Sequence, residues 1–195
     1  VKPMRTFVAV NVSSDTTKSA QRMMRQIDET GVGAKCVQTP SMHIALKFLG
    51  EVQIEDTPEI CKAVGRAAHG MLSFMIECGG LGAFPERSRP RTIWMGVQTG
   101  VTALRQLQER VDEETRHIGY HGETRQFHPH LTLARIRSTA EQAEPLQAVL
   151  NKYPLGPDST TTVTTETWVD EVIVYASIME RGTPSYEVLG RSRLR

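Results

Sequence analysis

The stretch His43-Ile-Ala-Leu-Lys-Phe-Leu49 predicts a β-strand that begins with a histidine. Side chains alternate between the two faces of a strand. The face that carries His43 is therefore expected to hold Ala45 and Lys47 as well. The opposite face is apolar and is expected to pack in the core: Ile44, Leu46 and Phe48. One face of this strand is thus available for chemistry, while the other drives its burial.

A second stretch, Phe127-His-Pro-His-Leu-Thr-Leu-Ala-Arg135, predicts another strand that begins with a histidine, at His130. The same alternation places Thr132 on the His130 face and the two leucines on a buried face. Strict alternation places Arg135 opposite His130, so that only a β-bulge or the end of the strand would bring it to the same face. The chain therefore contains two strands of one design.

Outward from these strands, the chain repeats one order of elements: a strand, a helix and then a strand that begins with histidine. Residues 5–12 are rich in β-branched and aromatic types, which favours a buried strand, and Ser13 or Ser14 is expected to cap the helix that follows. Residues 92–97 and 101–111 predict the second strand and helix. Because strands also follow one another directly, this order favours an α+β fold with largely antiparallel sheets over a doubly wound parallel sheet.

The composition indicates a packed domain with little net charge. With 195 residues and 39% hydrophobic content, the chain suits one domain or two fused lobes of roughly 100 residues each. Its 23 basic and 22 acidic residues nearly balance, which argues against binding along a nucleic acid through counterion release. Any contact with RNA is therefore expected to be local, for example to one end of the molecule.

Cysteine spacing and apolar runs indicate a cytoplasmic protein. Cys36, Cys61 and Cys78 lie far apart and suggest neither a disulfide framework nor a zinc ribbon. No stretch approaches the roughly 18 apolar residues of a membrane span. The apolar run within residues 1–11 is too short for a signal peptide. We therefore expect no association with a membrane.

A pair of histidines is suited to the cleavage of a phosphodiester. The pKa of a histidine is about 6.5 when unperturbed, so that near neutral pH one ring can be neutral while the other is protonated. The neutral ring accepts a proton from attacking water and the imidazolium donates one to the departing oxygen, each contributing roughly 10² to 10⁴ in rate. The hydroxyl of Thr132, beside His130, can donate to a phosphate oxygen.

Five passages, in this order and with similar separations, resemble the 2H phosphoesterase superfamily, specifically the bacterial and archaeal RNA 2′,3′-cyclic phosphodiesterases once called 2′-5′ RNA ligases. They are residues 7–10, 42–51, 80–85, 127–135 and 186–189. The resemblance implies a two-lobed, LigT-like α+β fold with pseudo-twofold symmetry, in which largely antiparallel sheets line a central groove. Residues 1–195 would form a single domain of two intertwined lobes.

The resemblance also implies roles for the two histidines. His43 would be the proton donor to the O3′ leaving group, and His130 would be the proton acceptor that activates water. The product would be a 2′-phosphate, and no metal or other cofactor would be needed. The expected partner is RNA with a 2′,3′-cyclic phosphate terminus, such as a tRNA fragment, or a small cyclic nucleotide, bound by a monomer.

Three further residues are expected to bind the substrate phosphate: Thr132, Lys47 and Arg135. The first histidine motif departs from the family pattern, because Ala45 stands where a Thr or Ser is expected. A hydrogen bond to a charged group is worth roughly 1.5 to 3 kcal/mol. An impaired but active enzyme is therefore expected.

Three alternative functions are also compatible with the sequence. The first is the reverse reaction, in which tRNA halves are joined through a 2′-5′ bond. The second, suggested by Ala45, is binding of RNA ends with weak or no catalysis. The third is action on small cyclic nucleotides such as ADP-ribose 1″,2″-cyclic phosphate.

The remaining candidate side chains are given structural roles or left open. His128 and His130 could together ligate zinc, although an orienting role for His128 is favoured. The basic loop formed by Arg87, Arg89 and Arg91 could steer an RNA end or merely be solvated. His69, His117 and His121 are assigned to structural roles. Trp94 and Trp168 are assigned to the core.

Overall fold

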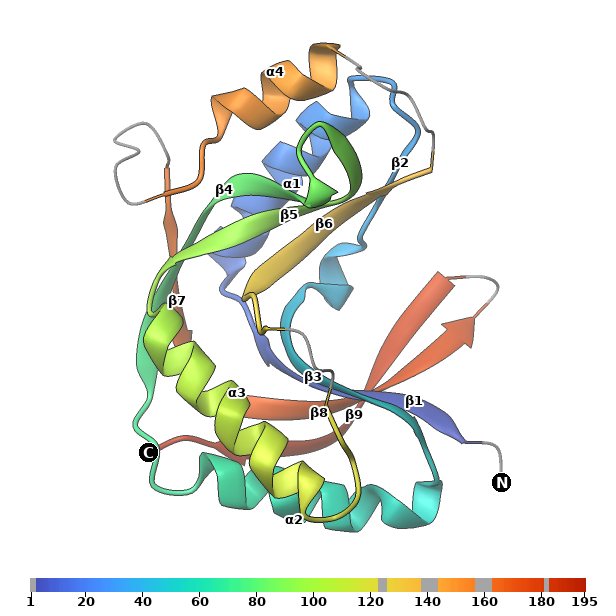
Figure 1. The fold of residues 1–195 in the computed structure, drawn as a ribbon, viewed down its shortest axis with the longest axis vertical. Coiled ribbons are helices and arrows are strands. Elements are labelled where there is room, and N and C mark those ends of the chain that lie inside the picture. Colours follow the sequence, from blue (N-terminus) through green and yellow to red (C-terminus); the bar gives the residue numbers. More distant parts are fainter. Residues whose placement is uncertain (1–2, 123–125, 138–143, 157–162, 181–182) are drawn as a thin grey trace.

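The computed structural model describes residues 3–122, 126–137, 144–156, 163–180 and 183–195. Within these residues, nine strands form one curled antiparallel sheet, accompanied by helices (Figure 1). The α+β fold class predicted from the sequence is thereby confirmed.

The sheet consists of two halves that meet at its centre. The first half contains, in spatial order, β3 (His43–Val52), β1 (Met4–Asn11), β8 (Glu171–Glu180) and β9 (Thr183–Arg193). The second half contains β6 (His130–Ile136), β5 (Arg89–Thr99), β4 (Phe74–Glu86) and β7 (Thr165–Val169), and the short strand β2 (Ala34–Cys36) also pairs with β6. The two halves are joined through β3 and β6, where Ile44 pairs with Leu131.

Two of the described helices pack against the half of the sheet that they do not directly follow. The described helices are α1 (Ser14–Asp28), α2 (Thr57–Ala68), α3 (Val101–Arg116) and α4 (Glu144–Lys152), with two short 3₁₀ turns, η1 (Thr39–Ser41) and η2 (Ile54–Asp56). Helix α1 follows β1 of the first half but packs against β2, β6 and β7 of the second, while α3 follows β5 of the second half but packs against β3 and α2. Figure 1 shows α1 and α4 together at one end of the molecule and α2 and α3 together at the other.

Local sequence signals account for helix α1. The side chain of Ser13 accepts a hydrogen bond from the backbone N–H of Thr16, which confirms one of the two predicted caps. The apolar side of the helix, at Met23, Met24 and Ile27, is buried in the core. In β3 and β6, the two histidines lie on the side of the strand opposite to the buried residues Ile44 and Leu131. We call this side the histidine face.

A β-bulge interrupts the alternation of β3. Two adjacent residues of β1 pair with Ala45 and with Lys47, so that Leu46 between them is an extra residue. An extra residue reverses the faces of all the residues that follow it. Leu46 and Lys47 are consequently both buried, and Phe48 is exposed.

Strand β6 has the same bulge at the equivalent position. Two adjacent residues of β5 pair with Thr132 and with Ala134, which leaves Leu133 as the extra residue. Leu133 and Ala134 are both buried, while Arg135 is exposed. The bulge thus turns Arg135 to the histidine face. The equivalent positions of β3 and β6 are His43 and His130, Ala45 and Thr132, Lys47 and Ala134, and Phe48 and Arg135.

The two tryptophans, both expected in the core, differ. Trp94 is 5% exposed, which confirms its prediction. The prediction for Trp168 is wrong, because this side chain is 60% exposed. Trp168 lies on the edge strand β7, where alternation buries Thr167 and Val169 and turns the tryptophan outward.

The three cysteines lie in separate parts of the fold. Cys36, Cys61 and Cys78 are free thiols, and burial raises the pKa of Cys78 to about 12. None of the described helices combines the length and apolar character needed to cross a bilayer.

Candidate active site

The two histidines lie next to the single bridge between the half-sheets. His43 immediately precedes Ile44 and His130 immediately precedes Leu131, the two bridge residues. Both histidines are half-buried, whereas Ile44 and Leu131 are in the core. In this antiparallel register the two histidines occupy diagonal positions on either side of the bridge. Side chains at such positions can approach one small anion together.

The segment that precedes β6 holds the ring of His130 in one tautomer. Its Nδ1 lies 2.6 Å from the backbone carbonyl oxygen of His128. A carbonyl oxygen only accepts, so Nδ1 carries the proton and Nε2 of the neutral ring is free to accept one. Burial lowers the pKa of His130, with a smaller lowering by His128 and an opposing effect of the carbonyl hydrogen bond. His130 is therefore equipped to act as a general base.

Aromatic rings support His130 from the second half-sheet. The ring centroid of His130 lies 5.0 Å from that of Phe84 and 5.8 Å from that of Trp94. Trp94 also contacts the ring of His128, at 4.8 Å. The rings of Phe84 and Trp94 thus limit the positions that the His128-Pro-His130 segment can adopt.

Gly82 makes room for Trp94. A Cβ atom at this position would overlap atoms of the Trp94 indole, whereas one at Gly65 of α2 would come no closer than 3.7 Å to the Ser192 hydroxyl. We expect Gly82→Ala to lower the free energy of unfolding by roughly 1 to 3 kcal/mol, as overpacking does in cores. Urea denaturation of both glycine-to-alanine variants measures this effect. Equal transition midpoints for Gly82→Ala and Gly65→Ala would contradict the expectation.

Aromatic residues of the first half-sheet surround His43. Its ring centroid lies 4.6 Å from that of Phe7, 5.2 Å from that of Tyr186 and 6.0 Å from that of Tyr175. The hydroxyl of Tyr175 donates to Oδ1 of Asn11, the residue that pairs with His43 across β1 and β3. The His43 ring is therefore held by rings from three strands.

Thr132 and Ala45 occupy equivalent half-buried positions on the histidine face. Each lies two residues after its histidine and before the bulge, where alternation still holds. The predicted placement of Thr132 beside His130 is confirmed. At Ala45 the same position has no hydroxyl.

Arg135 lies on the histidine face because of the bulge, and strict alternation gave the wrong face for it. Burial raises the pKa of Tyr186, and the charges of Arg135 and Arg5 oppose that shift. The charge of Arg135, from the second half-sheet, thus acts on Tyr186 of the first, whose ring contacts that of His43.

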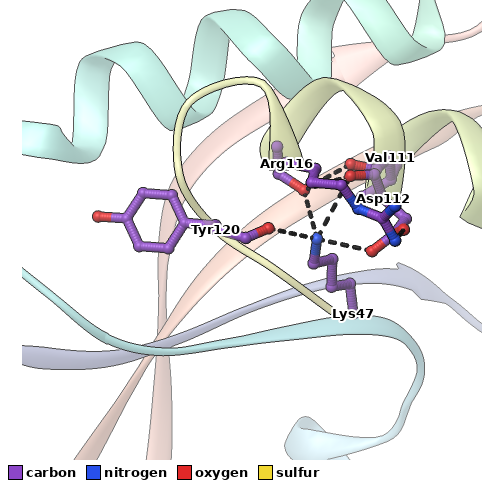
Figure 2. Close-up of polar contacts among 6 residues, drawn as sticks. Lys47, Val111, Asp112, Arg116 and Tyr120 are labelled. Carbon is purple, nitrogen blue, oxygen red and sulfur yellow. Dashed lines mark hydrogen bonds and ion pairs between the residues drawn. The ribbon is translucent and has the colours of Figure 1, made fainter. Parts of the chain in front are cut away.

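The predicted phosphate-binding role of Lys47 is wrong. The bulge turns Lys47 away from the histidine face, and the residue is 5% exposed. Its Nζ pairs with Asp112 at 2.7 Å and donates to the hydroxyl of Thr115 at 2.9 Å and to the carbonyl of Tyr120 at 2.7 Å (Figure 2). These contacts satisfy the three donors of an ammonium group.

Phe48, expected in the core, is exposed instead. The same bulge places it on the histidine face, where it is 58% exposed and its ring centroid lies 5.8 Å from that of Phe7. Its apolar ring is available for stacking.

The basic loop is a tight turn between β4 and β5, and Arg89 and Arg91 belong to β5. Arg87 donates to the carbonyl of Leu81 at 2.6 Å and to Asn151 at 3.3 Å, so its guanidinium is held on the protein. Within the described residues, no group of three or more His, Cys, Asp or Glu side chains is arranged to hold a metal ion.

Sequence reasoning did not identify Tyr186, Phe7, Phe84 or Gly82 as parts of the site. Phe84, Gly82 and Tyr186 lie within passages of family resemblance, as does Phe7, and this was the only signal available. Their proximity to the histidines follows from strand pairing between distant parts of the chain.

Comparisons with known proteins agree with this arrangement. A family model described as LigT like Phosphoesterase matches residues 10–94 and 97–158. The RNA 2′,3′-cyclic phosphodiesterase of Thermotoga maritima is 31% identical over 95% of this chain and 93% of that protein. Among solved structures, TT0787 of Thermus thermophilus has a TM-score of 0.79 and 23% identity over 98% of both chains. The structure of E. coli LigT complexed with 3′-AMP has a TM-score of 0.73 and 25% identity, again over 98% of both chains.

Proposed function

This chain belongs to the LigT-like phosphoesterase family, and from that premise we propose that it hydrolyses 2′,3′-cyclic phosphate ends of RNA to 2′-phosphates without a metal ion. The observation that carries the proposal is the position of His43 and His130 on one face, on either side of the bridge between the half-sheets. The Thermotoga maritima relative, which matches this chain over nearly its whole length, is an RNA 2′,3′-cyclic phosphodiesterase by name, and this supports the class of reaction.

The state of His130 supports its role as the proton acceptor. Nε2 of its neutral ring takes a proton from water, whose oxygen bonds to the phosphorus atom. The bond from phosphorus to O3′ breaks, and His43 as the proton donor protonates the departing O3′. The products are a 2′-phosphate and a free 3′-hydroxyl.

Thr132 and Arg135 are the proposed phosphate ligands. The Thr132 hydroxyl donates to a non-bridging oxygen, and the Arg135 guanidinium balances the charge that develops on the phosphoryl group. Lys47 has no part in this binding because its ammonium group is buried against α3. The exposed ring of Phe48 suits stacking of a nucleobase, which favours RNA ends as substrates.

Incubation of the purified protein with an RNA oligonucleotide that ends in a 2′,3′-cyclic phosphate, in the presence of EDTA, tests the proposal. A 2′-phosphate product, identified by mass and by phosphorus NMR, is expected. Absence of this product from both the wild type and Ala45→Thr would reject hydrolysis.

Joining of RNA ends through a 2′-5′ bond is the second candidate, since the near-equivalent positions of the histidines allow their roles to be exchanged. An added oligonucleotide with a 5′-hydroxyl, at high concentration, distinguishes this reaction by the length of the product. A third arm with ADP-ribose 1″,2″-cyclic phosphate compares small cyclic nucleotides with RNA.

The rate–pH profile is expected to show an acidic limb below a pH of about 6.5. Burial lowers the pKa of His130 from its ordinary value, so that protonation of Nε2 and loss of kcat/KM occur only below that pH. Measurement of kcat/KM between about pH 4.5 and pH 9 locates the limb. An acidic limb that persists unchanged in His130→Ala would contradict this assignment.

A further inference from the structure

The separation of the two histidines depends on how the half-sheets are joined. The β3–β6 ladder consists of a single bridge, Ile44 to Leu131, within the described residues. A single bridge does not by itself prevent the two half-sheets from rotating relative to each other. The proposed chemistry, however, needs the rings of His43 and His130 on opposite sides of one phosphorus atom. A second attachment between the halves is therefore required to fix their geometry.

Helix α3 provides that attachment. It leaves β5 of the second half at Gly100, where a side chain would overlap the backbone of Met75 and the side chain of Ile76. The helix then packs against β3 and α2, and the chain returns to the second half at β6. Helix α3 is therefore joined at both ends to the half-sheet that carries His130, and it packs against the strand that carries His43.

The C-terminal part of helix α3 is fixed to β3 by Lys47. Nζ contacts Asp112 and Thr115 in the last turns of α3, and the carbonyl of Tyr120 in the segment after it. We call these four residues the Lys47 cluster (Figure 2). Gly122 lies against it, because a Cβ there would overlap Oδ1 of Asp112 and lie 3.5 Å from Cε of Lys47.

Helix α1, the other exchanged helix, is held in an equivalent way. The hydroxyls of Thr16 in α1 and Thr167 in β7 are hydrogen-bonded at 3.0 Å, and both side chains are buried. Most of the buried polar residues of the described core belong to these two attachments. The residues of the two attachments are Thr16, Thr167, Lys47 and Thr115. The other buried polar residues are Thr6 and Ser19, which belong to neither attachment. Buried polar groups impose geometry more than they add stability in the cases where this has been established.

We propose that Lys47 is a positioning residue: by fixing the end of α3 to β3, its buried ammonium group sets the distance between His43 and His130. The bulge at Leu46 is what makes this possible, since it directs Lys47 to the helices while His43 stays on the histidine face. The kinetic consequence rests on the function proposed above, whereas the structural one does not.

Steady-state kinetics of Lys47→Met and Asp112→Asn, on an RNA end with a 2′,3′-cyclic phosphate, test the proposal. Each assay is run well below the melting temperature of the variant. We expect kcat to fall about tenfold to a hundredfold with KM nearly unchanged, as for a small displacement of reacting groups. Gly122→Ala, which disturbs the cluster without removing a charge, is expected to give a smaller fall in kcat.

Two controls separate positioning from loss of stability. Arg116→Ala removes the exposed partner of the other Asp112 oxygen, 2.8 Å away, and leaves Lys47 in place. Leu150→Ala destabilises the core at α4, away from the cluster. Both controls are expected to retain the wild-type kcat in the folded protein. A rise in KM at constant kcat in Lys47→Met, or an equal fall of kcat in Leu150→Ala, would overturn the proposal.

Amide hydrogen exchange tests the cluster without any reference to catalysis. Exchange of the amides of β3 and β6 around Ile44 and Leu131 is expected to be faster in Lys47→Met and Asp112→Asn, and unchanged in Arg116→Ala. Unchanged exchange in all variants would overturn the proposal. If the wild type lacks hydrolytic activity, the proposed function fails, and the exchange experiment still decides the role of Lys47.

Discussion

Replacement of His130 by alanine is expected to lower kcat for hydrolysis of a 2′,3′-cyclic phosphate by about 10² to 10⁴, because the variant has no group that accepts the proton of water. The ring of His130 is already neutral and has Nε2 available, since Nδ1 donates to the His128 carbonyl. The fall is measured by steady-state kinetics with a cyclic-phosphate oligonucleotide.

A matching fall is expected for His43→Ala, and the double variant should be little worse than either single variant, because the two groups act in one step. His69→Ala serves as the control, since His69 is exposed at the end of α2, away from the histidine face. A His130→Ala enzyme with at least one tenth of the wild-type kcat would exclude His130 as the general base.

Introduction of a threonine at position 45 is expected to raise kcat/KM by about tenfold to a hundredfold. Ala45 is equivalent to Thr132, lies on the same face and is half-buried, so that a hydroxyl there would point toward the phosphate. A hydrogen bond to a charged group is worth roughly 1.5 to 3 kcal/mol, which corresponds to that factor. Its cross-strand partner is the small residue Ala9.

The reciprocal substitution, Thr132→Ala, provides the matched comparison. It is expected to lower kcat/KM by a similar factor, and Ala45→Thr in that background should recover part of the loss. Ala45→Val, which has the shape of threonine without the hydroxyl, should give no gain. Equal rates for Ala45→Thr and Ala45→Val would mean that position 45 does not contact the phosphate.

The part of the site before each bulge could be predicted from the sequence. Alternation correctly places Thr132 on the face of His130 and Ala45 on the face of His43, and the order of strands and helices correctly indicates an antiparallel α+β fold. These features follow from local periodicity, which is readable along the chain. That the two histidine strands share one groove was implied only by the family resemblance.

The part of the site after each bulge could not be predicted from the sequence. An extra residue in a strand has no distinct residue type, and at Leu46 and Leu133 it is simply one more apolar residue in an apolar run. The faces of Lys47, Phe48 and Arg135 were consequently reversed relative to strict alternation. Trp168 was misplaced for a different reason, since the sequence does not state which strand lies at the edge of the sheet.

The exchange of α1 and α3 between the half-sheets has a consequence for dividing the chain. A cut between β5 and α3 would divide both halves of the sheet. The N-terminal fragment would keep β1 and β3 of the first half with β2, β4 and β5 of the second, and the C-terminal fragment would keep β6 and β7 of the second half with β8 and β9 of the first. Each fragment would lack neighbouring strands of both halves and would expose apolar surface to water, so we expect neither to fold on its own. Co-expressed fragments would have to complement each other, and each reassembled molecule would contain one copy of both.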